Sequence, residues 1–407
     1  MDSLKEVLDN HEDVSTISPE VHPSTACERY QKLVDEVFGQ GVVNIKEEPA
    51  NSITGTLQHV GEYKEFKANL ASRLHRLKAL FEKTASYPAL LTQVAEVASA
   101  RNWAGAYAEL VAYDIMWNDG LMGGIELNKS MPQTASYAGE MGYQETNEDG
   151  FIPELGIYFD VKILGSPVDS ILSGITEEAL KKFAQVQPCH ILCEYPLDDD
   201  VGKYQGATRP KLLQELLAYL HQCNTLAARQ SILRSQVIPD LAYKILWGGG
   251  VNSAMSAYSP YRHAEETRHL VFQRYTKKLM KEDPFFLVLV NFPWYNGRVD
   301  SFIDADQIYY RSLARRTFCE YKNLDVPMRA VVPRYHGPET VYEVSRHLTG
   351  IVFLNDNSIT GDNYDCFAYM NPNAVNIPSP LARKYVISLV NHGVERSLFD
   401  DMAYDNY

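Results

Sequence analysis

The feature that most constrains the fold is the segment 149–164, whose second half has the pattern of a half-buried strand. Residues 157–163 alternate between apolar and polar side chains, and residues two apart in a strand lie on the same face. Asp160 and Lys162 therefore lie side by side. A proline and a glycine just before the alternating stretch predict a tight connection from a shorter strand that begins near Asp149. The segment is predicted to be a hairpin that brings Asp149 close to Asp160 and Lys162.

This arrangement of two carboxylates and a lysine has a chemical use. Carboxylates at short range repel one another unless a cation lies between them. Their hard oxygen atoms suit Mg²⁺ or Mn²⁺, which keep several waters and can share a phosphate oxygen. A lysine beside such an ion can orient the attacking water or neutralise charge that develops on phosphorus. The alternative is an ordinary surface salt bridge, because Asp-x-Lys occurs by chance in many proteins.

A preceding helical run, residues 103–116, is strongly apolar but carries Glu109 on its apolar side. A glutamate in that position costs free energy unless it is paired or lies near a metal ion. Four residues then follow one another on a helix, the start of one strand and the next strand: Glu109, Asp149, Asp160 and Lys162. In this order and on these elements, the chain resembles the PD-(D/E)xK nuclease superfamily, which has the restriction-endonuclease-like fold.

The resemblance implies a metal-dependent endonuclease that hydrolyses phosphodiester bonds. The carboxylates of Asp149 and Asp160 and the backbone carbonyl of Val161 are expected to bind Mg²⁺ or Mn²⁺. Lys162 is expected to position the attacking water, and Glu109 to hold a metal-bound water or a second ion. Many standalone members of the superfamily defend bacteria against phage, so an antiviral role is expected by analogy.

The alternative from another class is a nuclease-like fold without catalysis, which acts in nucleic-acid binding or complex assembly. A buried Lys162 beside a metal ion distinguishes the two hypotheses, because a scaffold needs no such group.

The chain departs from the superfamily pattern at one position. The residue before the first aspartate is Glu148 instead of a proline, so Glu148 or Glu154 can be the first metal ligand in place of Asp149. The close match covers residues 103–164, and the rest of the chain is similar only in the order of its expected elements. Some members place a glutamine or a lysine near the metal from a later helix, and Gln273 and Lys277 are the candidates here, with a solvated helix face as the alternative role.

The formal net charge of −14 argues against a surface that binds nucleic acid over its whole extent. Binding is expected in a cleft lined by a few cations, for which the candidates are Arg311, Arg315, Arg316 and Lys277. A spacing of four places Arg311 and Arg315 on one helix face. Because such a cleft binds weakly by itself, we expect a homo-oligomer or a partner protein that delivers the nucleic acid, DNA more than RNA.

With 407 residues, 45% of them hydrophobic, the chain can bury a large core. The predicted fold class is α/β, with a mixed central sheet flanked by helices, an N-terminal helical region and helical insertions. A continuous apolar run at 285–291 is typical of a strand buried on both faces. We expect a polar N-terminus and helical region at 1–95, of which 1–60 is partly ordered at best, a nuclease-like domain at 96–380, and a C-terminal helix with an acidic tail at 381–407.

The order of elements after the hairpin predicts one further feature of the sheet. A helix at 176–187 and an apolar strand at 189–195 follow the strand at 157–163. A strand, helix and strand of these lengths favour a parallel pair joined by a right-handed crossover.

The six cysteines are scattered and form no CxxC pair, which is typical of buried free thiols in a reduced cytoplasmic protein. The acidic N-terminus does not have the pattern of a signal peptide, and the apolar runs are shorter than a membrane span. We therefore expect a cytoplasmic location and no membrane partner.

Overall fold

The computed structural model describes most of the chain, with gaps. The described residues are 23–47, 51–57, 64–99, 102–117, 124–142, 144–164, 167–183, 189–195, 201–204, 206–222, 232–247, 260–292, 305–358 and 364–391. They form two compact units, and the boundary lies between Leu110 and Val111, inside helix α6 (Trp103–Met116). The first unit therefore extends beyond residue 95, where the first predicted domain ends.

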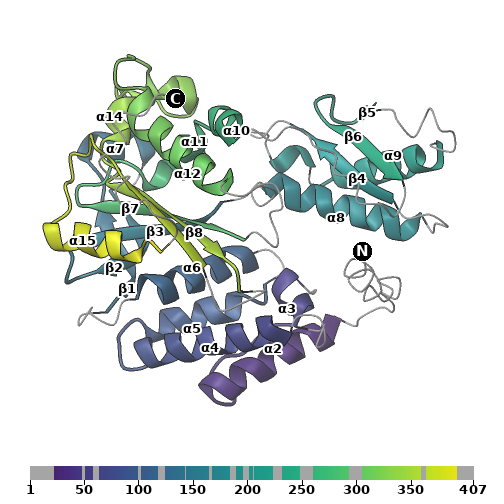
Figure 1. Ribbon diagram of the computed structural model, residues 1–407, viewed down its shortest axis with the longest axis horizontal. Coiled ribbons are helices and arrows are strands. Elements are labelled where there is room, and N and C mark those ends of the chain that lie inside the picture. The colour runs from purple at the N-terminus through teal and green to yellow at the C-terminus, as the bar shows by residue number, and fades with distance from the viewer. Residues whose placement is uncertain are drawn as a thin grey trace, which may run out of the picture. The chain divides into compact units, whose positions relative to one another are not determined.

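Unit 1 consists of helices that bury apolar faces against one another. They are α2 (Pro23–Phe38), α3 (Ser52–Thr56), α4 (Lys64–Phe81), α5 (Tyr87–Glu96) and the first part of α6 (Figure 1). On α4, Leu70, Leu74 and Leu77 are fully buried, at the spacing of a single helix face. The core of unit 1 therefore follows directly from the helical periodicity of its sequence.

Helix α2 lies within the segment 1–60, which the sequence predicts to be partly ordered at best; residues 1–22, 48–50 and 58–60 lie outside the described residues. The buried side chains of α2 include Tyr30, Leu33, Val34 and Val37. These positions follow the i, i+3, i+4, i+7 spacing of an amphipathic helix. The charged residues between them make the segment polar on average, and composition therefore concealed a helix that its periodicity supports.

Unit 2 contains a six-stranded mixed sheet with the strand order β1-β2-β3-β7-β8-β9. The strands are β1 (Glu126–Pro132), β2 (Glu145–Ile152), β3 (Ile157–Ile163), β7 (Phe285–Asn291), β8 (Gly350–Asp356) and β9 (Tyr364–Met370). The pairs β1–β2, β2–β3 and β8–β9 are antiparallel, and β3–β7 and β7–β8 are parallel. The predicted α/β class with a mixed central sheet is confirmed, and so is the hairpin of β2 and β3.

Helices accompany the sheet in unit 2. They are the second part of α6, α7 (Ala135–Met141), α10 (Pro260–Glu266), α11 (Leu270–Tyr275), α12 (Ala305–Arg315), α13 (Met328–Val331), α14 (Val341–Ser345) and α15 (Pro380–Leu389), with a 3-10 turn η3 (Thr276–Lys278) and a π-helix η4 (Arg316–Glu320). No helix within the described ranges is both long and apolar enough to cross a bilayer.

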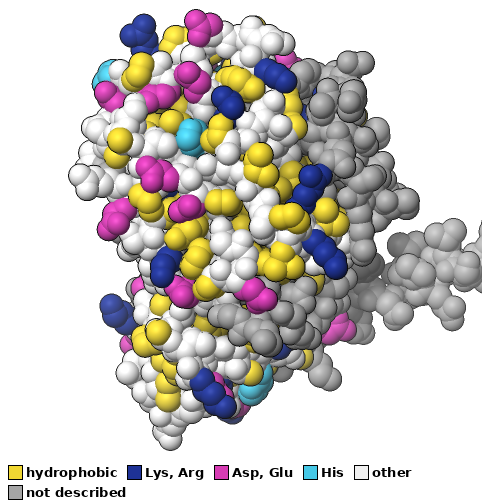
Figure 2. All heavy atoms as spheres, turned by 90° about the vertical axis from the view of Figure 1, so that its left-hand side faces the viewer, with side chains coloured by type: hydrophobic (Ala, Val, Ile, Leu, Met, Phe, Trp, Pro, Cys, Tyr) yellow, Lys and Arg dark blue, Asp and Glu magenta, His cyan; other side chains and the backbone are white. Residues whose placement is uncertain are grey.

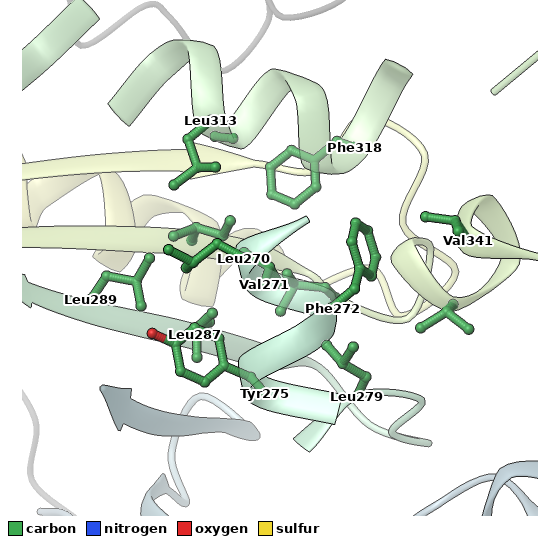
Figure 3. Packing of buried hydrophobic residues seen from close by; sticks show 14 of the residues in the cluster. Leu270, Val271, Phe272, Tyr275, Leu279, Leu287, Leu289, Leu313, Phe318 and Val341 are labelled. Atoms are coloured by element: carbon green, nitrogen blue, oxygen red, sulfur yellow. The ribbon is translucent and has the colours of Figure 1, made fainter. Parts of the chain in front are cut away.

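The main core lies between the sheet and the helices α11, α12 and η4. Every residue of β7 is buried, as predicted for the apolar run 285–291. Figure 3 shows Leu287 and Leu289 of this strand packed with Phe272 of α11 and Leu313 of α12. Full burial of one such side chain contributes about 1.5–3 kcal/mol. This core makes the central strands a rigid support for polar groups at their edge.

The strand register decides which side of the sheet Asp160 and Lys162 face. Asp160 pairs with Leu287 and Lys162 pairs with Leu289. Residues paired across neighbouring strands point to the same face. Both polar side chains therefore lie on the side of α11 and η3, whereas Phe159 faces the other side, where its ring lies 6.4 Å from that of Tyr113 on α6.

A smaller sheet corrects the predicted crossover. Strand β4 (Cys189–Glu194) pairs with β6 (Ala242–Trp247), which also pairs with β5 (Ile232–Arg234), all antiparallel. Helices α8 (Pro167–Lys182) and α9 (Thr208–Gln222) and the 3-10 turn η1 (Val201–Tyr204) contribute buried side chains to its core. The parallel partner of β3 is therefore β7, and β4 belongs to a module inserted between them. Local spacing identified β4 as a strand but carried no information on its partner.

Candidate active site

Strands β2 and β3 separate at the point where the predicted carboxylates lie. Their backbone pairing ends at Gly150 and Phe159. A Cβ atom on Gly150 would lie 2.0 Å from a ring carbon of Phe159, so only glycine lets the ring lie across β2. Beyond this pair, the Val161 N–H donates a hydrogen bond of 2.7 Å to Oδ2 of Asp149. The Asp149 side chain thus accepts a backbone hydrogen bond of β3 where the two strands part.

The Lys162 ammonium lies where the predicted metal ligands converge. Its Nζ is 3.5 Å from Asp149 Oδ2, forms an ion pair with Asp160 Oδ2, and donates a 2.8 Å hydrogen bond to the carbonyl oxygen of Val161. Burial lowers the pKa of Lys162, but the Asp160 and Asp149 carboxylates outweigh it and hold the pKa above its usual range. Lys162 is therefore protonated at neutral pH and occupies a position formed by three oxygen atoms.

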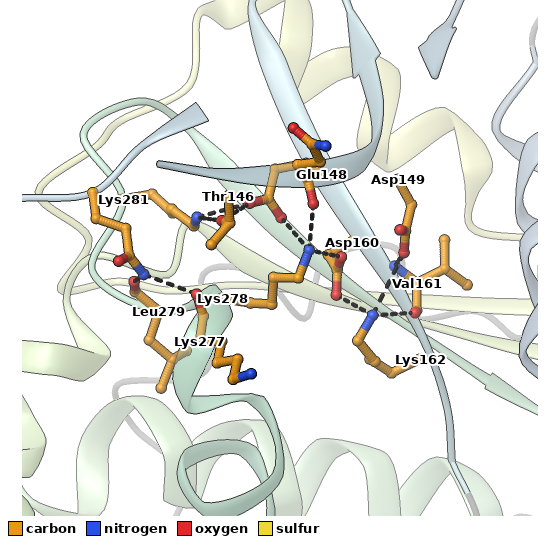
Figure 4. Close-up of polar contacts among 12 residues, drawn as sticks. Thr146, Glu148, Asp149, Asp160, Val161, Lys162, Lys277, Lys278, Leu279 and Lys281 are labelled. Atoms are coloured by element: carbon orange, nitrogen blue, oxygen red, sulfur yellow. Dashed lines mark hydrogen bonds and ion pairs between the residues drawn. The ribbon is translucent and has the colours of Figure 1, made fainter. Parts of the chain in front are cut away.

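A second group of charges adjoins the first (Figure 4). Lys278 of η3 lies between two fully buried carboxylates, with Nζ 2.7 Å from Asp160 Oδ1 and 3.5 Å from Glu148 Oε2. Lys281 is also fully buried, and its Nζ is 2.7 Å from Glu148 Oε1. Thr146 donates to the same Oε1 and accepts from Lys281. Carboxylates and ammonium groups therefore alternate from Lys281 to Asp149.

The electrostatic balance differs between the two lysines of this second group. Burial lowers the pKa of Lys278, yet Asp160 and Glu148 outweigh burial and raise the pKa above its ordinary value. For Lys281, burial is the dominant influence, and Glu148 recovers only part of it, so its pKa is lowered. Lys281 is thus the most easily deprotonated of the three ammonium groups.

Three buried carboxylate oxygens depend on these ammonium groups. Within the described part of the chain, Glu148 Oε2 and both Oδ atoms of Asp160 accept no hydrogen bond of regular geometry. Their polar contacts are the ion pairs with Lys162 and Lys278. Buried charged oxygens of this kind need a positive charge nearby.

The sequence did not identify Lys278 and Lys281 as partners of the carboxylates. Lys277 was the candidate, but its side chain is exposed and points away from Asp160 in Figure 4. Its backbone oxygen accepts a hydrogen bond from Gln133 instead. The chain leaves helical geometry after Lys278, and Met280 has a φ of 58°, which turns Lys281 back toward Glu148. Helical spacing could not reveal that turn.

The remaining predicted site residues are Glu109 and the three arginines. Glu109 belongs to unit 1 and is partly exposed, so its role at carboxylates of unit 2 stays a prediction. Arg315 is only 6% exposed, so its predicted contact with nucleic acid would require the side chain to move. Arg316 donates to Glu320 at 3.2 Å. Contacts of Arg311, Arg316 and Lys277 with nucleic acid stay predictions.

The oxygen atoms around Lys162 have the chemistry of a site for a hard cation. In the described residues, no three His, Cys, Asp or Glu side chains form a possible metal site. Mg²⁺ is commonly held by one or two carboxylates, with water and substrate phosphate completing its coordination. Asp149, Asp160 and the Val161 carbonyl provide such a set once Lys162 moves aside, and its side chain is 30% exposed. Glu154, which the sequence offers as an alternative first ligand, is exposed on the turn after β2.

Comparison with known proteins does not identify a family for this chain. No family model matches the chain, and no curated protein or solved structure matches it either.

Proposed function

We propose that this protein is a metal-dependent nuclease that hydrolyses phosphodiester bonds of nucleic acid. The observation that carries the proposal is the convergence of Asp149 Oδ2, Asp160 Oδ2 and the Val161 carbonyl on the Lys162 ammonium. These are the hard oxygen donors that Mg²⁺ or Mn²⁺ prefers. The order of these residues on the hairpin also agrees with the resemblance to PD-(D/E)xK nucleases.

The roles of the residues follow from their positions. Asp149 and Asp160, with the Val161 carbonyl, hold the divalent ion. The ion supplies Lewis acidity toward a phosphate oxygen and lowers the pKa of a bound water. Lys162 orients the attacking water and offsets negative charge as it develops on the phosphoryl oxygens. By the resemblance alone, Glu109 is proposed to hold a metal-bound water.

The proposed substrate is DNA more than RNA, and the proposed setting is defence against phage, both by analogy with the superfamily. On the face drawn in Figure 2, basic and acidic side chains of the described residues are interspersed. Together with the net charge of −14, this supports binding confined to a cleft, with a second copy or a partner protein contributing affinity.

One observation favours the alternative of an inactive assembly module. Glu148, Asp149 and Asp160 already have Lys162, Lys278 and Lys281 as counter-charges. In such a network the carboxylates have counter-charges without any metal ion. Divalent-ion binding at Asp160 is therefore the property that separates the two functions.

The test is incubation of the protein with supercoiled plasmid, single-stranded DNA and RNA in the presence of Mg²⁺, Mn²⁺ or EDTA. Asp160→Ala is expected to abolish cleavage, and Lys162→Ala to slow it by about 10²-fold or more while Mn²⁺ binding persists. The control is Lys129→Ala, which removes an exposed ion pair with Glu126 on β1. Full activity of an Asp160→Ala, Lys162→Ala double variant, free of contaminating nuclease, would overturn the proposal.

A further inference from the structure

Lys278 occupies the space between two fully buried carboxylates. Its Nζ lies 2.7 Å from Asp160 Oδ1 and 3.5 Å from Glu148 Oε2. The other oxygen of Asp160, Oδ2, faces Lys162. The two oxygens of this one carboxylate are therefore directed to two different cation positions, as Figure 4 shows.

Lys278 is held in this position from three directions. Besides the two carboxylates, its ammonium donates a 2.5 Å hydrogen bond to the backbone oxygen of Asn147. Glu148 is fixed in turn by Lys281 and Thr146. The Lys278 side chain is only 18% exposed, against 30% for Lys162. The larger exposed fraction favours Lys162 over Lys278 as the group that leaves its carboxylates when an ion binds.

A cation between two carboxylates is what a second metal ion provides in nucleases that use two metals about 3.5–4 Å apart. Here the position between Asp160 and Glu148 holds an ammonium group supplied by the chain itself. A divalent ion placed there would have to displace Lys278, because two cations at such short range repel one another.

We propose that the site binds a single divalent ion, because Lys278 takes the place of a second one. The inference rests on the proposed function. Lys278 is then a positioning residue: it holds Asp160 Oδ1, so that Oδ2 alone is left for the ion. Hydrogen bonds and ion pairs to the free oxygen of a metal ligand fix its orientation in this way.

The test counts Mn²⁺ ions bound per chain, by electron paramagnetic resonance of free Mn²⁺ during titration and by calorimetry. One ion is expected for the wild-type chain. Lys278→Met removes the ammonium and leaves Glu148 and Asp160 facing one another, so two ions are expected. Lys277→Met is the matched control, because it removes the neighbouring, exposed lysine, and it should still bind one ion.

The outcomes separate this inference from the proposed function. Two ions in the wild-type chain, or one ion in a folded Lys278→Met variant, would overturn the inference and leave a metal-dependent nuclease in place. Absence of Mn²⁺ binding in the wild-type chain would remove both. Lys278→Gln, which keeps a donor for Asp160 without the charge, should also bind two ions and serves if Lys278→Met does not fold.

Discussion

Replacement of Lys281 by methionine should destabilise the six-stranded sheet, because it leaves Glu148 buried without its nearest counter-charge. The two charges are 2.7 Å apart and both side chains are fully buried. At an effective dielectric constant of about 20 their attraction is about 6 kcal/mol. Methionine avoids the desolvation of an ammonium group, and Lys278 still lies 3.5 Å from Glu148. The net loss of unfolding free energy is therefore expected near about 3–5 kcal/mol.

Hydrogen-exchange mass spectrometry on peptides from β2 and β3 measures this loss where it arises, without requiring the whole chain to unfold in one step. A double variant, Glu148→Gln with Lys281→Met, removes both charges and keeps a hydrogen-bonding side chain beside Thr146. It should recover at least half of the lost free energy. A loss below about 1 kcal/mol in Lys281→Met, or a double variant no more stable than the single one, would refute the reasoning.

The lowered pKa of Lys281 gives the same variant a pH signature. A lysine whose pKa is lower in the folded state binds its proton less tightly there, so unfolding free energy rises with pH between the folded pKa and the unfolded value of about 10.4. Lys162 and Lys278 have raised pKa values and act in the opposite direction, above that value. Urea unfolding followed by circular dichroism at several alkaline pH values should therefore show a less positive slope of unfolding free energy against pH in Lys281→Met than in the wild type. An unchanged pH dependence would contradict the assignment.

Two further predictions concern the packing of β2 against β3 beside the site and the arginines proposed to bind DNA. Gly150→Ala places a methyl group against the ring of Phe159 and should cost about 1–3 kcal/mol, whereas Gly139→Ala, with open space around it on α7, should be neutral or stabilising by up to about 1 kcal/mol in thermal unfolding. Equal melting temperatures would contradict the close approach of β2 and β3. Arg315→Glu should lower the melting temperature because the side chain is buried, whereas Arg311→Glu should keep the fold and lower the salt dependence of DNA binding by about one unit of the log–log slope. A stable Arg315→Glu variant, or an unchanged slope for Arg311→Glu, would contradict these placements.

The sequence by itself determined the local elements of the candidate site. Strict alternation over 157–163 specified the strand β3 and placed Asp160 and Lys162 on one face of it. The turn residues before it specified a hairpin, and the continuous apolar run 285–291 specified a fully buried strand. These features depend on side chains at most a few residues apart. Over that distance, the period of the backbone conformation appears in the sequence as a regular spacing of apolar and polar residues.

Only the tertiary structure decided which distant groups meet. It selected Lys278 and Lys281 in place of Lys277 as counter-charges, and Lys281 reaches Glu148 through a turn at Met280 that helical spacing does not predict. It paired β3 with β7 across an inserted module, and it buried Arg315. The physical reason is the same in each case. Pairing and burial depend on which surfaces close against each other when the whole core forms, and no local pattern of side chains records that choice.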